Sequence, residues 1–338
     1  MLPRIAVDLL GGDLGRSVVV EGALRAVSEG VAKITLVGPA SSTDLAGCEA
    51  RAGDLGWLEA SEQVLPGEAP AAAVMKKPAA SINVACRAHA QRQVDAVVTL
   101  GHSGAAVVSS HRHLRPLRGV RRAALMSTVP GANGAVCLLD VGAVVEPSAQ
   151  DLLANGRLGL AYWRSARLSD LSFEVRTGGQ PRVALLSNGA EATKGTSLVR
   201  EAHSLLEAGL PEYVGMIEGH RVLSGDADVV VCDGFVGNIL LKGMEGVLEH
   251  VLKVVLRGVS QGEGWEAGGG AWEALRPLLF QERGGALLLG VDGVVVVAHG
   301  RSDATAVFHA IQLAAQWVQD DLLTKLKGHL SLRINSSS

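Results

Sequence analysis

The sequence predicts an α/β fold with Rossmann-like layers around a largely parallel sheet, and two observations carry this prediction. Short runs rich in Val, Ile, Leu and Ala alternate along the 338-residue chain with segments of helical periodicity. Such alternation is typical of parallel strands joined by helices. Several runs, such as residues 229–232, contain no polar position, which indicates strands buried on both faces of a sheet.

The expected strands are short apolar runs that end in a turn or a polar residue. They span residues 4–8, 33–37, 96–99, 123–128, 136–140, 182–186, 212–216, 228–232 and 294–298. Helices are expected where apolar side chains recur every three to four positions. They span residues 17–29, 81–93, 104–114, 148–167, 195–208 and 237–259, with a last helix from 303 to about 327.

We expect a single α/β domain over residues 1–330, with a helical excursion at about 248–282 and a disordered tail at 331–338. The glycine-rich stretch 258–270 lies within the excursion. It is either a surface loop between two ordinary helices or an exposed apolar tip that contacts a bilayer or a partner. The tail is short and serine-rich, which is typical of a frayed end.

The composition excludes several classes of function. A net charge of −3 and an aromatic content of 3% argue against nucleic-acid binding. The N-terminus lacks the features of a signal peptide, and no apolar run reaches membrane-spanning length, so a cytoplasmic protein is expected. No Cys pair or His/Cys/carboxylate cluster has metal-ligand spacing, so we expect neither a metal nor another cofactor.

The most informative segment is residues 227–242, where a buried strand delivers polar residues to the start of a helix. Asp233 and Gly234 end the strand, and Gly237 and Asn238 open the helical pattern. Ligands in open parallel sheets bind outside the carboxyl ends of strands, where helix N-termini present N–H groups. An ordinary strand-to-helix turn is the alternative interpretation.

The first strand ends in a similar junction, Asp8-Leu-Leu-Gly-Gly-Asp13. Gly11 and Gly12 permit a tight turn and close ligand approach, and Asp13 could cap the next helix. Both Asp8 and Asp13 could equally be structural. The spacing does not match a dinucleotide-binding fingerprint.

The strand at 96–99 leads into Gly101, His102, Ser103 and Gly104. The glycines could free backbone N–H groups for an anion, and His102 and Ser103 could add donors. Helix capping by Ser103 is an alternative. A nucleophilic Ser103 is disfavoured because the spacing is not that of a nucleophile elbow.

Two further strand ends carry polar groups. Asp140 follows the strand at 136–140 and is either an anchor at the sheet edge or a site acid. Asn188 makes a turn, and Lys194 stands at a helix start, where its charge opposes the helix dipole unless it faces an anion. Together these groups predict an anion site, of phosphate size, without an obligatory metal.

The last junction follows the apolar strand at 294–298 and contains His299, Arg301 and Ser302. Histidine shuttles protons near neutral pH, and arginine binds oxyanions with two hydrogen bonds. A histidine that only packs in the core is the alternative. The residues alone do not identify the reaction.

Taken in order along the chain, these segments resemble the phosphate:acyl-carrier-protein acyltransferases (the PlsX family). The resemblance covers roughly residues 4–315. The matching pieces are Ile5-Ala-Val-Asp8, Gly11-Gly-Asp13, Ile34-Thr-Leu-Val-Gly38, Leu138-Leu-Asp-Val-Gly-Ala143, Pro181-Arg-Val183, Lys194-Gly195, residues 227–238, Leu241-Lys242, residues 284–290 and residues 298–303.

The resemblance implies a fold similar to the isocitrate/isopropylmalate dehydrogenase-like group, and a homodimer. It implies transfer of a long-chain acyl group from acyl carrier protein to inorganic phosphate. The acyl phosphate product would feed a membrane glycerol-3-phosphate acyltransferase. A cytoplasmic enzyme, peripherally associated with the membrane, would fit the apolar excursion.

Site roles follow from the resemblance as hypotheses. We expect phosphate to attack the thioester directly, without an acyl-enzyme. His299 or Lys194 would position phosphate or assist proton transfer. Asn238, Asn188 and the loop 101–104 would bind phosphate or the oxyanion.

The sequence departs from the family pattern at a few positions. The departures are Leu9-Leu10 before the glycines, His102 for an Asn, Val144 for another Asn, and Pro78-Ala79-Ala80-Ser81 in a segment where the family carries hydroxyls. The loss of these groups bears on substrate geometry and activity. His102 could replace the missing amide as a donor.

Three alternatives remain open. A phosphotransacetylase-like enzyme that uses coenzyme A would share the fold, and the donor distinguishes it. An acidic carrier protein favours a basic surface, for which the candidates are Arg112, Arg115, Arg118, Arg121 and Arg122. A metal- and NAD-dependent hydroxy-acid dehydrogenase lacks its metal cluster here. The third is a non-catalytic scaffold on a membrane or on synthesis enzymes.

Overall fold

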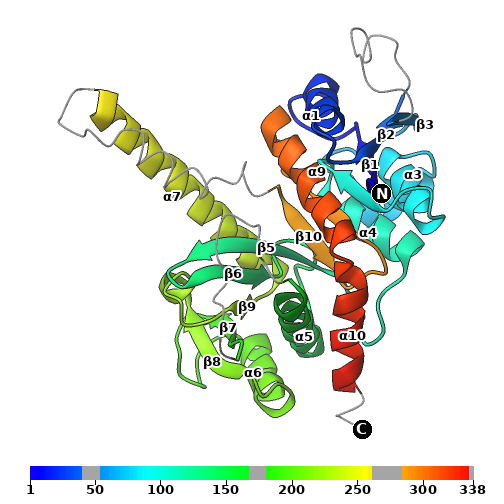
Figure 1. The fold of residues 1–338 in the computed structure, drawn as a ribbon. Coiled ribbons are helices and arrows are strands. Elements are labelled where there is room, and N and C mark those ends of the chain that lie inside the picture. Colours follow the sequence, from blue (N-terminus) through cyan, green and yellow to red (C-terminus); the bar gives the residue numbers. More distant parts are fainter. Residues whose placement is uncertain (40–53, 167–179, 261–283, 335–338) are drawn as a thin grey trace.

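The computed structural model describes residues 1–39, 54–166, 180–260 and 284–334, and an 11-stranded sheet runs through them (Figure 1). The strands lie in the order β3-β2-β1-β4-β11-β10-β5-β6-β9-β7-β8. Their bounds are β1 Arg4–Asp8, β2 Lys33–Gly38, β3 Leu55–Glu59, β4 Ala96–Thr99, β5 Ala124–Gly131, β6 Gly134–Leu139, β7 Val183–Ser187, β8 Tyr213–Glu218, β9 Val229–Val231, β10 Ala286–Leu289 and β11 Val295–Val297.

Helices connect most of these strands and cover both faces of the sheet. They are α1 Arg16–Ser28, α2 Pro70–Lys76, α3 Ser81–Ala90, α4 Ser103–Leu114, α5 Ala149–Ser165, α6 Ser197–Gly209, α7 Gly234–Ser260, α9 Ala304–Gln319 and α10 Leu322–Ile334, with a 3-10 turn at Gly219–Arg221. The predicted α/β class is confirmed. Among the described elements, β3, β10 and α2 have no counterpart in the sequence prediction.

The sheet is parallel in its two outer parts and antiparallel at its centre. β3, β2, β1, β4 and β11 run parallel to one another, as do β6, β9, β7 and β8. Between them, β10 is antiparallel to β11 and β5, and β5 is antiparallel to β6. The strands of the two parallel parts therefore run in opposite directions.

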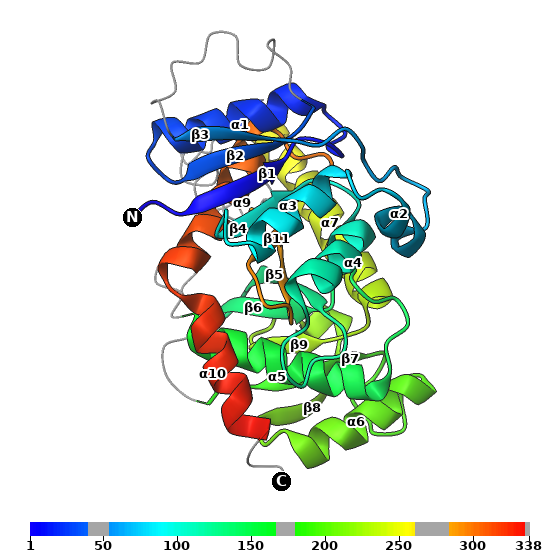
Figure 2. The same cartoon turned by 90° about the vertical axis from the view of Figure 1, so that its right-hand side faces the viewer.

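Side chains alternate across each strand, so two apolar layers form, one on each face. Val229 and Val231 of β9 join one layer with α1, α5, α6, α9 and α10. Val230 joins the other layer with α3, α4 and the start of α7. Figure 2 shows α2 and α3 in the upper half of the molecule, α4 below them, and α5 and α6 in the lower half.

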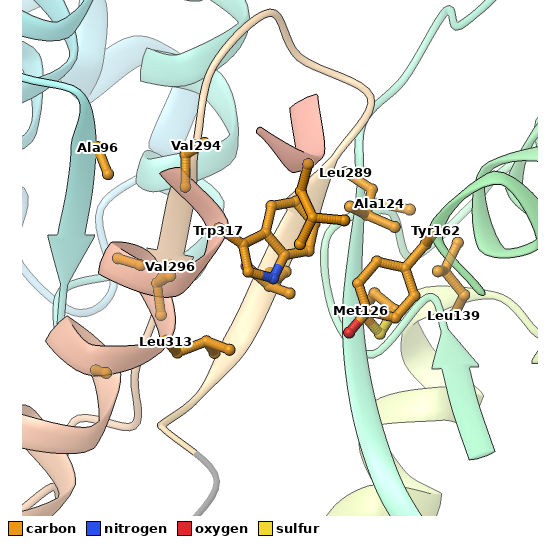
Figure 3. Close-up of a cluster of buried hydrophobic side chains, with 14 of the residues drawn as sticks. Ala96, Ala124, Met126, Leu139, Tyr162, Leu289, Val294, Val296, Leu313 and Trp317 are labelled. Carbon is orange, nitrogen blue, oxygen red and sulfur yellow. The ribbon is translucent and has the colours of Figure 1, made fainter. Parts of the chain in front are cut away.

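The first layer is tied together by two aromatic side chains (Figure 3). The rings of Tyr162 in α5 and Trp317 in α9 stack with centroids 5.4 Å apart and planes 19° apart. Both are buried, and Leu289 of β10 lies in the same cluster. This contact joins helices that cover different halves of the sheet.

The chain ends in two helices rather than in the one helix expected over 303–327. α9 stops at Gln319, and Asp321 adopts a positive φ of 51°, so α10 starts in a new direction. α9 packs on α1, whereas α10 packs on α5. The expected tail at 331–338 is also wrong for its first residues, because α10 continues to Ile334; residues 335–338 lie outside the described part.

The predicted excursion begins within α7, which projects away from the rest of the molecule in Figure 1. The helix exposes Val247, Val251 and Val254. Residues 261–283, and with them most of the expected loop and second helix, lie outside the described residues. Among the helices that the structure describes, none has the length and hydropathy of a membrane span.

Candidate active site

A cavity of about 300 Å³ lies where several of the predicted junctions meet. Five of its lining residues were predicted as site residues from the sequence: Gly101, Ser103, Asn238, His299 and Ser302. The remaining lining residues are Leu125, Ser127, Val141, Leu241, Lys242, Glu245, Gly284, Gly285, Ala286, Val297, Ala298, Gly300 and Ala306.

The topology of the sheet explains this location. β4 and β11 are parallel neighbours, but the helices that follow them cover opposite faces: α4 packs in one apolar layer and α9 in the other. A crevice forms at the carboxyl ends of two such strands, and ligands bind there in open α/β sheets. α7 adds Asn238, Lys242 and Glu245 to the crevice.

His299 is held in one orientation within this cavity. The backbone N–H of Arg301 donates to its Nδ1 at 3.0 Å. The neutral imidazole therefore carries its proton on Nε2 and acts as a hydrogen-bond donor there. Burial lowers the pKa of His299, and the charge of Lys242 lowers it further, so the neutral form dominates at pH 7.

Two charged residues of α7 complete the cavity and were not among the predicted site residues. Lys242 Nζ and Glu245 Oε2 form an ion pair at 2.8 Å. Both lie on the helix face of Asn238, because Lys242 follows it by four residues and Glu245 by seven. That spacing is the sequence signal that identifies them.

The loop after β1 supports the cavity from behind. Asp8 is buried and accepts hydrogen bonds from Thr99 Oγ1 at 2.8 Å and from the Leu10 N–H at 2.9 Å. Burial raises its pKa to about 6. A Cβ on Gly11 would lie 2.5 Å from Gly101 Cα, so the close approach of the loops after β1 and β4 requires glycine at position 11.

Asp13 and Gly12 lie beside the loop after β11. The Asp13 N–H donates to the Gly300 carbonyl at 2.7 Å, and a Cβ on Gly300 would approach the Asp13 carboxylate to within 2.9 Å. The expected capping role of Asp13 is wrong: α1 has Gly15 at its N-cap and no side-chain cap. Gly12 packs near Leu100.

The junction after β4 uses His102 as the helix cap. Its Nδ1 accepts from the Gly104 N–H at 3.1 Å. Capping by Ser103 is therefore wrong, and Ser103 instead lines the cavity as the first residue of α4. His102 does not line the same cavity.

Asp140 organises the backbone between the strand end and α7. Its carboxylate accepts four N–H groups, from Leu125, Gly142, Ala143 and Val144, at 2.8–3.1 Å. Burial raises its pKa to about 6. These four bonds support the interpretation of Asp140 as a structural anchor at the sheet edge rather than as a site acid. Asp140 lines neither this cavity nor the second one described below.

The start of α7 packs directly on this segment. A Cβ on Gly237 would lie 1.9 Å from the Asp140 carbonyl oxygen, and one on Gly234 would lie 2.7 Å from the Val144 carbonyl oxygen. Asp233 caps the helix by accepting the Val236 N–H at 2.8 Å. Gly234 and Gly237 are therefore positions of close backbone approach.

A second cavity, of about 590 Å³, contains two more of the predicted site residues. Asn188 and Asp233 line it, together with Gly195 and Thr196 at the start of α6. Lys194 is exposed next to this group, and it does not line the cavity of His299. The predicted single anion site is thus divided between two cavities.

The departures from the family pattern lie outside the first cavity. Ser81 is buried and hydrogen bonds to Asp8, and neither it nor Val144 lines the cavity. The candidate arginine patch begins in the last turn of α4, at Arg112, and continues beyond it, whereas the cavity adjoins the amino end of the helix. Arg121 is already paired with Asp151.

Among the described residues, no three His, Cys, Asp or Glu side chains gather with the geometry of a metal site. Cys86, Cys137 and Cys232 are free thiols in the buried core. The polar groups of the first cavity are hydrogen-bond donors, one cation (Lys242) and one carboxylate (Glu245). Such a set can hold an oxyanion and stabilise negative charge that develops beside it.

Nearly the whole chain is similar to known proteins. Residues 3–325 match the family model FA_synthesis, described as "Fatty acid synthesis protein". The chain is 38% identical over 336 residues to the phosphate acyltransferase of Desulforudis audaxviator, covering 96% of this chain and 95% of that protein. It is 39% identical over 352 residues to that of Synechocystis sp., covering 99% and 94%.

Solved structures share the fold at low sequence identity. A phosphotransacetylase from Streptococcus pyogenes matches with a TM-score of 0.60 and 17% identity, over 94% of each chain. A 4-hydroxythreonine-4-phosphate dehydrogenase from Klebsiella pneumoniae matches with a TM-score of 0.52 and 14% identity, over 94% of this chain and 99% of that one. The fold is thus one shared by acyl-transfer and dehydrogenase enzymes.

The α/β architecture and the family of its relatives define an α/β enzyme of the acyltransferase class. The chain belongs to the phosphate acyltransferase family, as the sequence resemblance predicts.

Proposed function

We propose that this enzyme transfers a long-chain fatty acyl group from acyl carrier protein to inorganic phosphate, and that the reaction takes place in the cavity of His299. The observation that supports it most is the meeting of His299, Lys242 and the first turn of α4 around about 300 Å³. These groups supply a neutral donor, a cation and the hydroxyl of Ser103 for a phosphate-sized anion.

The proposed reaction is a direct displacement. A phosphate oxygen attacks the thioester carbonyl carbon, and the carbonyl oxygen becomes an oxyanion. The C–S bond then breaks, and the proton of hydrogenphosphate ends on the leaving thiolate. The products are acyl phosphate and the carrier thiol, so the step needs no redox partner.

Each polar residue of the cavity would have a role that follows from its charge. Lys242 would pair with phosphate, and Glu245 would hold the Lys242 ammonium in place through their ion pair at 2.8 Å. His299 would donate from Nε2 to phosphate or to the oxyanion, and Asn238 would add a second donor. Lys194, Asn188 and Arg301 lie outside this cavity, so we assign them no role in the chemical step.

The partners follow from the same proposal. The donor is acyl carrier protein, the acceptor is inorganic phosphate, and the acyl phosphate passes to a downstream membrane acyltransferase. The exposed Val251 and Val254 of α7 support contact with a membrane surface or with a second copy in a homodimer. We place the enzyme in the cytoplasm, peripherally on the membrane.

The test measures phosphate-dependent loss of palmitoyl-acyl-carrier-protein, with acyl phosphate trapped by hydroxylamine. The expected result is turnover with this donor, none with palmitoyl-coenzyme A, and loss of turnover in His299→Ala. Turnover with coenzyme A alone would instead support a phosphotransacetylase-like activity. A folded protein without turnover from either donor would contradict the proposal and favour a scaffold role.

A further inference from the structure

The second cavity is apolar at its floor and is the larger of the two. Its volume, about 590 Å³, lies within the roughly 300–1,000 Å³ that is usual for small-molecule sites. Leu152, Leu185 and Leu186 are buried at its floor. Val236 and Ile239 line it from α7, with 42% and 57% of their surfaces exposed.

The position of this cavity also follows from the topology. β7 and β9 are parallel neighbours, yet α6, which follows β7, packs in one apolar layer, and α7, which follows β9, packs in the other. The cavity occupies the crevice between their amino ends. A second location with the geometry that ligands favour in open α/β sheets therefore exists in the same sheet.

The edge of this cavity carries polar groups. Ser187 Oγ is buried and has no hydrogen-bond partner among the described residues. Asn188 lies next to it, with its Oδ1 accepting the Gly195 N–H at 2.9 Å. An apolar pocket with a few polar groups at one side matches a ligand that is mostly alkyl.

The same turns of α7 separate the two cavities. Val236, Ile239 and Leu240 face the second cavity, whereas Asn238 and Leu241 face the first. A helix with its side chains is roughly 10–12 Å across. A long alkyl chain attached at the first cavity can cross that width, and a short one cannot.

We propose that the second cavity holds the distal part of the fatty acyl chain of the donor, and that it makes the enzyme select long chains. The proposal rests on the proposed function for the identity of the donor. The apolar floor supplies the transfer free energy that a long chain gains on leaving water, and a short chain does not reach it.

The experiment compares Ile239→Trp, which fills the cavity from α7, with Val247→Trp. Val247 is 63% exposed on the same helix and does not line the cavity, so it is a matched control. Binding of radiolabelled palmitate and butyrate is measured by equilibrium dialysis. Steady-state kinetics use palmitoyl- and butyryl-acyl-carrier-protein, and circular dichroism confirms folding.

Palmitate is expected to bind the wild-type protein and Val247→Trp equally, and on the order of tenfold more weakly to Ile239→Trp. The KM for the palmitoyl donor rises in Ile239→Trp, while kinetics with the butyryl donor stay unchanged. Val199→Phe, which narrows the cavity from α6, should reproduce this pattern and replaces Ile239→Trp if that variant does not fold.

Three results would overturn the inference: absence of palmitate binding by the wild-type protein, equal weakening in Val247→Trp, or an equal effect on both donors. The first, together with a change of oligomeric state in Ile239→Trp, would assign this face to a second copy of the chain. Binding of palmitate but not of butyrate, without turnover of either donor, would support the inference and contradict the proposed reaction.

Discussion

The backbone N–H of Arg301 donates to Nδ1 of His299 at 3.0 Å, and this bond decides which nitrogen of the ring can act. Because Nδ1 is an acceptor, the neutral ring offers an N–H at Nε2. His299 is thus built as a donor rather than as a base. A base on Nε2 would require that nitrogen to be unprotonated.

The first prediction compares His299→Gln with His299→Ala. A glutamine amide can place an N–H near the position of Nε2, so His299→Gln should retain more activity than His299→Ala, whose kcat should fall about 10²–10³-fold. Single-turnover rates with palmitoyl-acyl-carrier-protein measure the difference. Equal losses in both variants would speak for proton transfer instead.

The second prediction concerns pH. Burial and Lys242 lower the pKa of His299 below its ordinary value of 6.5. Protonation of Nδ1 removes the acceptor of the Arg301 N–H and releases the ring from its orientation, so kcat/KM should fall only as the pH drops through a value below 6.5. Lys242→Gln removes a positive charge that disfavours the imidazolium, so this acid limb should move to higher pH. A pH profile of kcat/KM for both proteins checks the shift, and an unmoved limb would show that Lys242 does not act on His299.

The same titration affects stability in a defined direction. Below pH 6.5 the unfolded chain takes up a proton at His299 more readily than the folded one, because the folded pKa is lowered. The free energy of unfolding should therefore decrease as the pH falls through this range.

The third prediction concerns Gly237→Ala. The new Cβ would lie 1.9 Å from the Asp140 carbonyl oxygen, so the start of α7 must move, at a cost of about 1–3 kcal/mol or more. Gly243→Ala is the matched control, because its Cβ would meet no atom within 4 Å beyond its chain neighbours and the local helix backbone. Alanine there should stabilise the helix by up to about 1 kcal/mol. Urea unfolding measures both, and two changes of the same sign would contradict the packing described.

The fourth prediction concerns Tyr162, whose buried hydroxyl has no hydrogen-bond partner among the described residues. Tyr162→Phe keeps the stack on Trp317 and removes the unsatisfied group, so the free energy of unfolding should rise by about 1 kcal/mol or more. Tyr213→Phe is the contrast, since Tyr213 Oη bonds His203 Nδ1 at 2.8 Å; that variant should lose about 1 kcal/mol. A destabilised Tyr162→Phe would reveal a partner for the hydroxyl.

Sequence periodicity was sufficient for the elements whose residues form a complete local pattern. β1 and β4 have the expected bounds, because each is a short apolar run that ends where polar residues begin. β10 was missed because its four residues carry no period of their own and depend on pairing with β5 and β11. β3 was missed because it lies at the edge, where its side chains are half-exposed.

The candidate site was predictable as a set of strand ends, but its division was not. Gly101, Asn238 and His299 meet in one cavity, whereas Asn188 and Asp233 meet in another. The cavity in which a strand end lies depends on which face of the sheet the next helix covers. That choice of face is a property of the tertiary fold. Lys242 could have been found from its helical spacing to Asn238.

The strand order has a consequence for how this protein is made. β4 and β5 follow each other in the chain, but β11 and β10 lie between them in the sheet. A nascent chain that has not reached residue 286 therefore holds two partial sheets, in which β4 and β5 are unpaired edge strands. β10 and β11, which join the two partial sheets, are made after every other described strand. The ribosome-bound chain is therefore exposed to aggregation until residue 297 has emerged.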